Sequence, residues 1–224
     1  MNYLVVVAHP DDEVLGAGAT INKLICNGNN VAVAIMSTQA SARANISATL
    51  SDDEQKSMKL LGVKKVYEAE FPNIKMNTIP HLSLVQFIEK CIEDFNAEII
   101  ITHHPTDTNN DHVMTSYAVQ AACRLFQRRT DIIQLKELWY MEVLSSTEWS
   151  LDSSSNRFVP NCFVEIGKEG IGIKINALAT YKGVMRDFPH PRSKEAIMGL
   201  AAYRGSQSGC NYAEAFEAVI RRIV

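Results

Sequence analysis

Residues 3–13 read YLVVVAHPDDE, and they contain the change from an apolar run to a polar turn on which the class of fold depends. The run 3–8 is continuous and rich in β-branched residues, which is typical of a parallel strand buried on both faces. Pro10 ends this strand, because proline has no N–H to donate to a neighbouring strand. Residues 14–27 have the pattern of a helix, and Gly28 provides its C-cap. The stretch therefore predicts a strand, a polar turn and a helix in succession.

The same alternation of apolar runs and helical patterns continues along the chain, and it implies a parallel sheet with right-handed crossovers. We therefore predict a Rossmann-like, three-layer α/β fold with a mostly parallel central sheet and its active site at the carboxyl ends of the strands. No repeat or long linker divides the chain, so residues 1–224 are expected to form a single domain. Further strands are expected at 31–37, 65–71, 98–102, 138–143 and 162–166, and further helices at 51–61, 82–95, 111–129, 170–186, 193–203 and 212–222.

The composition narrows the class of protein. The chain has 224 residues, of which 46% are hydrophobic and 21% charged, as is usual for a globular domain. A formal net charge of -3 argues against a nucleic-acid partner, which binds a basic face. No apolar run is long enough to span a membrane, and residues 1–8 lack the basic region of a signal peptide, so a cytoplasmic location is expected. The five cysteines form no CxxC pair, which argues for reduced thiols.

Two polar segments follow predicted strands at their carboxyl ends. Residues 8–13 read AHPDDE and follow the first strand, and residues 102–112 read THHPTDTNNDH and follow the fourth. Such ends gather at one edge of a parallel sheet, so the two segments can converge. Taken singly, the aspartates could complement or cap the next helix, and a histidine could be a hydrogen-bonded core residue. Together, these histidines and aspartates exceed what capping needs, which favours a metal site.

Zinc suits this set of side chains. A catalytic zinc site uses three protein ligands drawn from His, Asp, Glu and Cys, and it leaves one position for water. A histidine and an aspartate three residues apart at a strand-to-helix bend can face one ion, and a third ligand from the other segment completes the set. One more carboxylate near the ion, but not bound to it, is then needed as a base.

These motifs resemble the PIG-L/LmbE-like family of zinc-dependent N-deacetylases, and its bacterial subgroup in particular. The resemblance rests on AHPDDE at 8–13, on Asp111-His112, and on the motifs LGV (61–63), FPHPRS (188–193) and YRGSQSG…YAEAF (203–216). It implies a hydrolase that removes the N-acetyl group of an amino sugar or its conjugate with one zinc ion, or another divalent transition metal. The implied site residues are His9, Asp12 and His112 as metal ligands, Asp11 as general base, Asp111 as a further catalytic residue, and Arg43, Asn109 and Arg192 as substrate contacts.

One position departs from the family pattern. The second motif usually reads His-Pro-Asp-His, and its first histidine assists the transition state, whereas this chain has Asn109 at that place. Either Asp11 returns its proton to the departing amine alone, or another group assists. We expect His190 to take this part by packing near Asp111, whose charge would raise the pKa of the histidine. The alternative interpretation leaves His190 as a spacer between two prolines.

Other functions compete with this one. Gly16 and Gly18 suggest a dinucleotide-binding loop, but Ile21 replaces its third glycine. Gln207 stands at the centre of GSQSG, where a serine hydrolase has its nucleophile. Acidic pairs also occur in magnesium-dependent receiver domains and phosphatases, but the histidines favour zinc. Two alternatives stay open: a sugar-binding or regulatory protein that has lost its chemistry, and a metal-dependent amidase for a non-sugar N-acyl substrate.

The expected partner is a small N-acetylated sugar, whose remaining structure the sequence does not identify. The polar loops 38–50 and 145–156 could cover this substrate or form an interface between copies of the chain. A homo-oligomer therefore stays open as an alternative to a monomer.

Overall fold

Seven strands form one mixed sheet in the computed structural model, which describes residues 1–38, 50–151 and 157–223. The strand order is β3-β2-β1-β4-β5-β7-β6, and β7 pairs antiparallel with both of its neighbours while the remaining pairs are parallel. The predicted α/β fold with a mostly parallel sheet is confirmed. The strands are β1 (Asn2–Val7), β2 (Asn30–Ile35), β3 (Lys65–Glu68), β4 (Ile99–His103), β5 (Glu137–Met141), β6 (Cys162–Glu165) and β7 (Ala213–Arg221).

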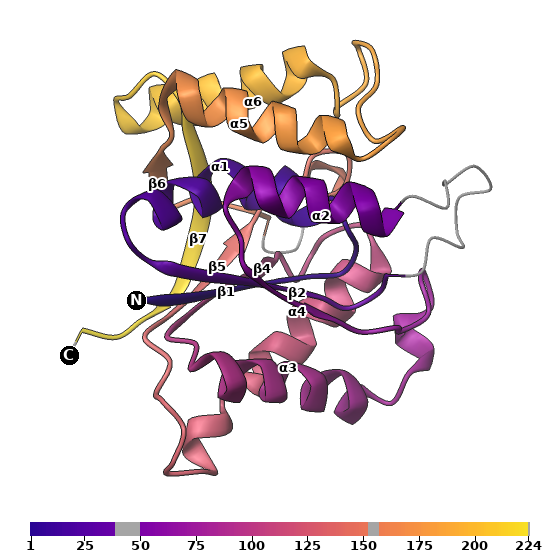
Figure 1. The fold of residues 1–224 in the computed structure, drawn as a ribbon, viewed down its shortest axis with the longest axis vertical. Coiled ribbons are helices and arrows are strands. Elements are labelled where there is room, and N and C mark those ends of the chain that lie inside the picture. Colours follow the sequence, from indigo (N-terminus) through magenta and orange to yellow (C-terminus); the bar gives the residue numbers. More distant parts are fainter. Residues whose placement is uncertain (39–49, 152–156, 224) are drawn as a thin grey trace.

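Helices cover both faces of the sheet and complete three layers, as Figure 1 shows. Helices α1, α2, α5 and α6 lie over one face, and α3 and α4 lie over the other. None of the helices in the described part of the chain is both long and apolar enough to cross a membrane. The helices are α1 (Asp12–Cys26), α2 (Leu50–Leu61), α3 (His81–Phe95), α4 (Asn110–Ala122), α5 (Gly167–Thr180) and α6 (Lys194–Ser208), with short 3-10 helices at Met76–Thr78, Leu125–Gln127 and Thr147–Trp149.

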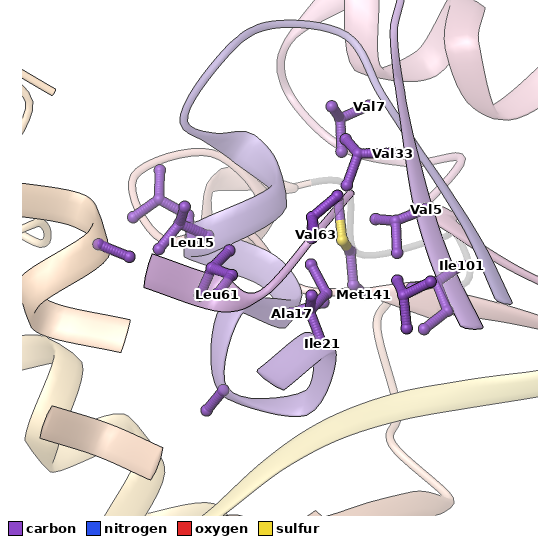
Figure 2. Close-up of a cluster of buried hydrophobic side chains, with 14 of the residues drawn as sticks. Val5, Val7, Leu15, Ala17, Ile21, Val33, Leu61, Val63, Ile101 and Met141 are labelled. Atoms are coloured by element: carbon purple, nitrogen blue, oxygen red, sulfur yellow. The ribbon is translucent and has the colours of Figure 1, made fainter. Parts of the chain in front are cut away.

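Strand β1 lies inside the sheet and is buried on both faces, as its continuous apolar run predicted. Val5 and Val7 belong to the cluster beneath α1, α2 and α5, where they pack with Leu15 (Figure 2). Leu4 and Val6 point to the other face and pack with residues of α3 and α4. Helices therefore have to cover both sides of this strand, and the polar turn that follows it has to emerge at the edge of the sheet.

The pairing of β1 with β4 brings the two polar segments together. Val6 pairs with Thr102, and the Thr102 hydroxyl donates to the Val6 carbonyl at 2.9 Å. One step further, the Ala8 N–H donates to Nε2 of His103 at 2.9 Å. Because the two strands run parallel and end level with each other, the turns that follow them leave the sheet side by side.

The helix that we predicted at 212–222 is wrong, because Ala213–Arg221 form strand β7. Alanine and glutamate favour helices as isolated residues, but pairing with β5 and β6 supplies backbone partners on both sides and overrides that preference. The two glutamates of the strand are bonded within the fold. Glu214 accepts hydrogen bonds from α1, and Glu217 lies 3.3 Å from Nε2 of His104.

Three other helices end elsewhere than expected, and one of them, α6, continues to Ser208 rather than 203. Helix α4 ends at Ala122 rather than 129, and a short 3-10 turn at Leu125–Gln127 follows it. Helix α5 ends at Thr180, because Tyr181 takes an extended conformation, with φ -76° and ψ 102°. The segment that follows α5 is therefore free to cross the edge of the sheet, where Arg192 reaches the polar turn after β1.

A buried ion pair joins α1, α5 and β7. The Lys174 ammonium lies 2.6 Å from the Glu214 carboxylate, and both side chains are less than 10% exposed. Lys174 also donates to the Leu15 carbonyl at 2.8 Å, and Glu214 accepts from the N–H groups of Ala19 and Thr20 at 3.2 and 2.6 Å. Each charge is thus matched by its partner and by backbone dipoles of α1, which fixes the helix that begins with Asp12.

We predict that Lys174→Met lowers the free energy of unfolding by about 3–5 kcal/mol, because it leaves the Glu214 charge buried without its partner. Urea denaturation followed by circular dichroism measures the change. The double variant Lys174→Met, Glu214→Leu should recover much of the loss, because it removes the unpaired charge. Arg129→Met, which breaks an exposed pair with Glu93, is the control and should change stability little. An equal loss in the single variant and the control would contradict the prediction.

Candidate metal centre

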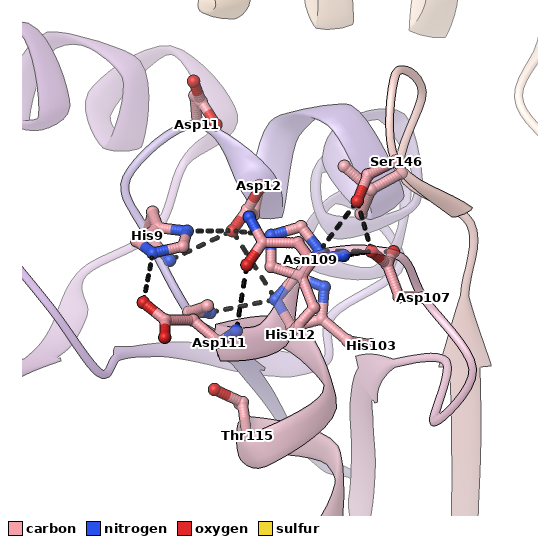
Figure 3. A network of polar contacts seen from close by, with 12 residues as sticks. His9, Asp11, Asp12, His103, Asp107, Asn109, Asp111, His112, Thr115 and Ser146 are labelled. Atoms are coloured by element: carbon pink, nitrogen blue, oxygen red, sulfur yellow. Dashed lines mark hydrogen bonds and ion pairs between the residues drawn. The ribbon is translucent and has the colours of Figure 1, made fainter. Parts of the chain in front are cut away.

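Three predicted ligands converge where β1 and β4 end. His9 and Asp12 come from the turn between β1 and α1, and His112 comes from the first turn of α4 (Figure 3). Oδ2 of Asp12 lies 3.4 Å from Nδ1 of His9 and 3.2 Å from Nε2 of His112. The three residues form a group whose ligand atoms lie within 4.8 Å of one another. The convergence that the strand ends predicted is therefore present.

The geometry of this group fits a small tetrahedral cation. Two ligands bound at about 2.1 Å on a tetrahedral ion lie roughly 3.4 Å apart, which is close to the distances from Asp12 to the two imidazoles. Two imidazoles and one carboxylate are the donor set of many catalytic zinc sites. His9 is the most accessible member, with a side chain 16% exposed, while Asp12 and His112 are buried.

A second carboxylate holds each of the two histidines. Nε2 of His9 lies 3.0 Å from Oδ2 of Asp111, and Nδ1 of His112 lies 3.2 Å from Oδ2 of Asp107. These bonds use the ring nitrogens that face away from Asp12, and they fix the orientation of both rings. Metal-bound histidines in proteins almost always have such a partner for their second nitrogen. The arrangement supports His9 and His112 as ligands and makes Asp111 a positioning residue for His9.

The buried charges shift the pKa values of all these groups. Burial lowers the pKa of His9, but its bonds to Asp111 and Asp12 outweigh this effect and raise the pKa to about 9. Burial acts likewise on His112, and the carboxylates of Asp12 and Asp107 raise its pKa to about 10. Burial alone would raise the pKa of Asp107, but His112 holds it at about 2. Without a metal, both imidazoles are therefore protonated at neutral pH and neutralise the carboxylates around them.

His103 supports the centre from within the sheet. Its ring stacks on that of His112 with 3.9 Å between centroids, and it is fully buried. Burial, together with the nearby charge of His112, lowers its pKa to about 3, so the ring is neutral. Because Nε2 accepts from the Ala8 N–H, the proton of the neutral ring lies on Nδ1. His103 also forms a group with Asp107 and His112 in which ligand atoms lie within 4.8 Å of one another.

Asp11 directly precedes Asp12 as the N-cap of α1, and Figure 3 shows its side chain above the ligand group, apart from the other side chains drawn. Its backbone is left-handed, with φ 98°. Oε2 of Glu13 accepts the Asp11 N–H at 3.1 Å, and the Tyr181 hydroxyl donates to Oε1 of Glu13 at 2.7 Å. Nη1 of Arg192 donates to Oδ2 of Asp11 at 3.1 Å, and Nε donates to Oγ of Ser145 at 2.8 Å. Contacts from α1, α5 and the segment before α6 thus hold Asp11 in place.

The prediction that the pKa of His190 is raised is wrong. Burial and the neighbouring charges of Arg186 and Arg192 lower the pKa of His190, whereas we expected Asp111 to raise it. Nδ1 of His190 accepts the backbone N–H of Arg192 at 3.0 Å. The carboxylate of Asp111 is bonded instead to His9 and to the N–H groups of Ile74 and Met76. His190 therefore shapes the loop that carries Arg192.

The other predicted substrate contacts differ in what the structure shows of them. Arg43 lies outside the described residues. Asn109 lies at the centre as the N-cap of α4, and its side chain accepts from the Asp111 N–H at 2.9 Å. Arg192 is bonded to Asp11 and Ser145, so at least part of its guanidinium makes hydrogen bonds within the protein.

Two groups of this centre were not predicted from the sequence. Asp107 lies within the second motif, and its place after a strand and five residues before His112 is a signal that could have identified it. Ser146 and Thr147 donate hydroxyl hydrogen bonds to the Asp107 carboxylate from the loop after β5. That loop is polar and rich in serine, and nothing in its sequence distinguishes these two hydroxyls from their neighbours.

Comparison with known proteins agrees with this centre. Residues 4–123 match the family described as PIG-L: GlcNAc-PI de-N-acetylase. The chain belongs to this family. It is 26% identical over 188 residues to the protein named "Uncharacterized deacetylase YaiS" of Escherichia coli (strain K12), a match that covers 80% of this chain and 89% of the relative. The predicted family membership is confirmed.

Two solved structures have the same fold. The N,N'-diacetylchitobiose deacetylase of Pyrococcus horikoshii gives a TM-score of 0.77 with 19% identity, covering 98% of this chain and 84% of that one. GalB, the 4-carboxy-2-hydroxymuconate hydratase of Pseudomonas putida KT2440, gives a TM-score of 0.78 with 18% identity, covering 100% and 98%. Because these two proteins carry out different reactions, the likeness establishes the fold of this PIG-L family member and not its reaction.

We predict that metal binding at pH 7.5 releases about two protons per ion, because the His9 and His112 pKa values of about 9 and 10 keep both rings protonated in the metal-free protein. Calorimetric titration with zinc in buffers of different ionisation enthalpy measures this number. It should fall as the pH rises through 9 to 10. The raised pKa values also stabilise the metal-free protein. This stabilisation is fully present below about pH 6.5, and it should be lost as the pH rises through 9 to 10. Release of no protons at pH 7.5 would contradict the assignment.

We also predict that Asp107→Asn weakens zinc binding by about 10–100-fold, because the His112 ring loses the charged acceptor that orients it. Competition with a chromophoric chelator measures the affinity. Asp131→Asn, which changes an exposed carboxylate paired with Arg129, is the control and should bind zinc as the wild type does. Equal zinc affinity of the two variants would show that Asp107 does not support His112.

Proposed function

We propose that this chain is a zinc-dependent hydrolase that removes the N-acetyl group of an amino sugar or an amino-sugar conjugate. The observation that carries the proposal is the arrangement of His9, Asp12 and His112 as one ligand group, with Asp11 directly before Asp12 at the start of α1. Membership in the de-N-acetylase family supports it. We also propose that residues 1–224 act as one domain, because both core clusters share the same sheet.

Each residue of the centre has a proposed part in the reaction. Zinc, when bound, would polarise the acetamide carbonyl and lower the pKa of water. Asp11 accepts a proton from the water that adds to the carbonyl carbon, and it later gives this proton to the nitrogen as the C–N bond breaks. The products are acetate and the free amine. The acid that donates the proton and the base that accepts it are thus the same carboxylate.

The contacts of Asp11 suit this part. The Arg192 guanidinium lies 3.1 Å from its carboxylate and forms an ion pair with it. Glu13 and Tyr181 fix the backbone from the other side. Among the described residues, Nη2 of Arg192 has no bonding partner, so it can contact the substrate. Arg43 would hold the sugar, as the family resemblance implies.

The fold alone does not select the reaction, because a hydratase shares it equally closely. A hydratase adds water to a carbon–carbon double bond and releases no amine, so its products separate it from a deacetylase. The family match over residues 4–123 favours the deacetylase. A sugar-binding protein without activity and an amidase for non-sugar substrates are the remaining alternatives.

We predict that the zinc-loaded protein releases acetate and a free amine in equal amounts from at least one of three sugars: N-acetylglucosamine, N,N'-diacetylchitobiose or an N-acetylglucosaminyl inositol. Enzymatic acetate assay and amine derivatisation measure both products. Asp11→Asn should keep its zinc and lose about 100-fold or more in turnover, because it removes the general base. Release from N-acetyl amino acids alone would support the amidase. Loss of zinc from Asp11→Asn would show that Asp11 is a ligand and not the base.

A further inference from the structure

Asn109 stands at the position where the family motif usually has a histidine, and two hydrogen bonds fix it there. Its backbone N–H donates to Oδ1 of Asp107 at 2.8 Å. Its side-chain Oδ1 accepts the Asp111 N–H at 2.9 Å as the N-cap of α4. The residue is therefore tied to the carboxylate of Asp107 and to the backbone N–H of Asp111.

The cap bond determines which end of the carboxamide faces the centre. A carboxamide has one accepting oxygen and one donating NH₂ group, and only the oxygen can accept the Asp111 N–H. The NH₂ group must point the other way, and Figure 3 shows it on the side where Asp12 and His9 lie. Among the described residues, Nδ2 of Asn109 has no hydrogen-bond partner, and the side chain is half-buried. The centre thus contains an oriented donor to which no described residue of the protein is hydrogen-bonded.

We propose that Nδ2 of Asn109 donates a hydrogen bond to the acetamide oxygen as water adds to the carbonyl carbon, an inference that rests on the proposed deacetylase function. The carbonyl oxygen gains the negative charge in this step, and a fixed donor stabilises it there. Asn109 transfers no proton. The proton taken from water stays on Asp11 until the nitrogen receives it, so the reaction remains balanced without an imidazole.

Substitutions can distinguish this role as a donor to the substrate from the role of Asn109 as the N-cap of α4. Asparagine, aspartate and serine are about equally good N-caps. Asn109→Ser keeps a neutral cap but lacks an NH₂ group that reaches into the centre. Asn109→Asp keeps both the shape and the cap but replaces the donor by an acceptor. A residue that only caps α4 would tolerate both changes.

The test compares these two variants with the wild type, all loaded with zinc. We expect kcat to fall by about 10²–10³-fold in both, the usual effect of removing one oxyanion donor, while KM and the melting temperature change little. The readout that does not depend on turnover is calorimetric binding of the N-methylphosphonamidate of glucosamine, whose tetrahedral phosphorus carries the charged oxygen. Asn109→Ser should bind this compound at least 10-fold more weakly than the wild type and should bind glucosamine equally well.

The outcomes separate this inference from the proposed function. If the wild type releases acetate and both variants keep kcat within about 3-fold, Asn109 is a cap only and the inference is overturned. Unchanged binding of the phosphonamidate by Asn109→Ser would overturn it as well. If the wild type releases no acetate from any N-acetyl compound, the proposed function fails, and the inference fails with it.

Discussion

The level, parallel pairing of β1 with β4 is the constraint on which the centre depends. Because Val6 pairs with Thr102, the turn that carries Asp12 and the segment that carries His112 leave the sheet next to each other. Four aspartates and two histidines then share a space with little water, where an unpaired charge is costly. Carboxylates and imidazoles alternate in this space, so that each imidazole lies between two carboxylates. Each carboxylate of the set has a cation or an N–H donor as its partner.

Backbone strain is concentrated around the same centre. Among the described residues, four other than glycine have positive φ, and three of them touch the site: Asp11, Ile74 and Ser145. For Ile74 this conformation is especially unfavourable, because its side chain is β-branched. Its N–H donates to Asp111 at 2.6 Å, and Oγ of Ser145 accepts from Arg192. Packing elsewhere in the fold has to maintain these conformations, and their location agrees with the tendency of strain to gather at functional sites.

The sequence predicted the parts of this structure that follow from local chemistry. A continuous β-branched run predicted β1, and the rule for strand ends predicted that His9, Asp12 and His112 converge. Elements that depend on distant partners could not be predicted in this way. The Ala- and Glu-rich segment at 213–221 is a strand because β5 and β6 flank it. The pKa of His190 is lowered by burial and by two nearby arginines, which only the fold determines. The carboxylate of Asp107 is held by hydrogen bonds from Ser146 and Thr147, which lie about forty residues further along the chain.

The charge of the centre is compatible with one fold in the presence and in the absence of a divalent ion. In the metal-free protein, the raised pKa values of His9 and His112 add two positive charges among the carboxylates. A divalent cation that displaces these two protons brings the same charge to the same place. The bonds from Asp107 and Asp111 to the far ring nitrogens are compatible with both states, since those nitrogens carry a proton in each. The protein therefore needs no rearrangement of its charged groups when the ion enters, and a neutral donor such as Asn109 leaves this balance unchanged where a protonated imidazole would add to it.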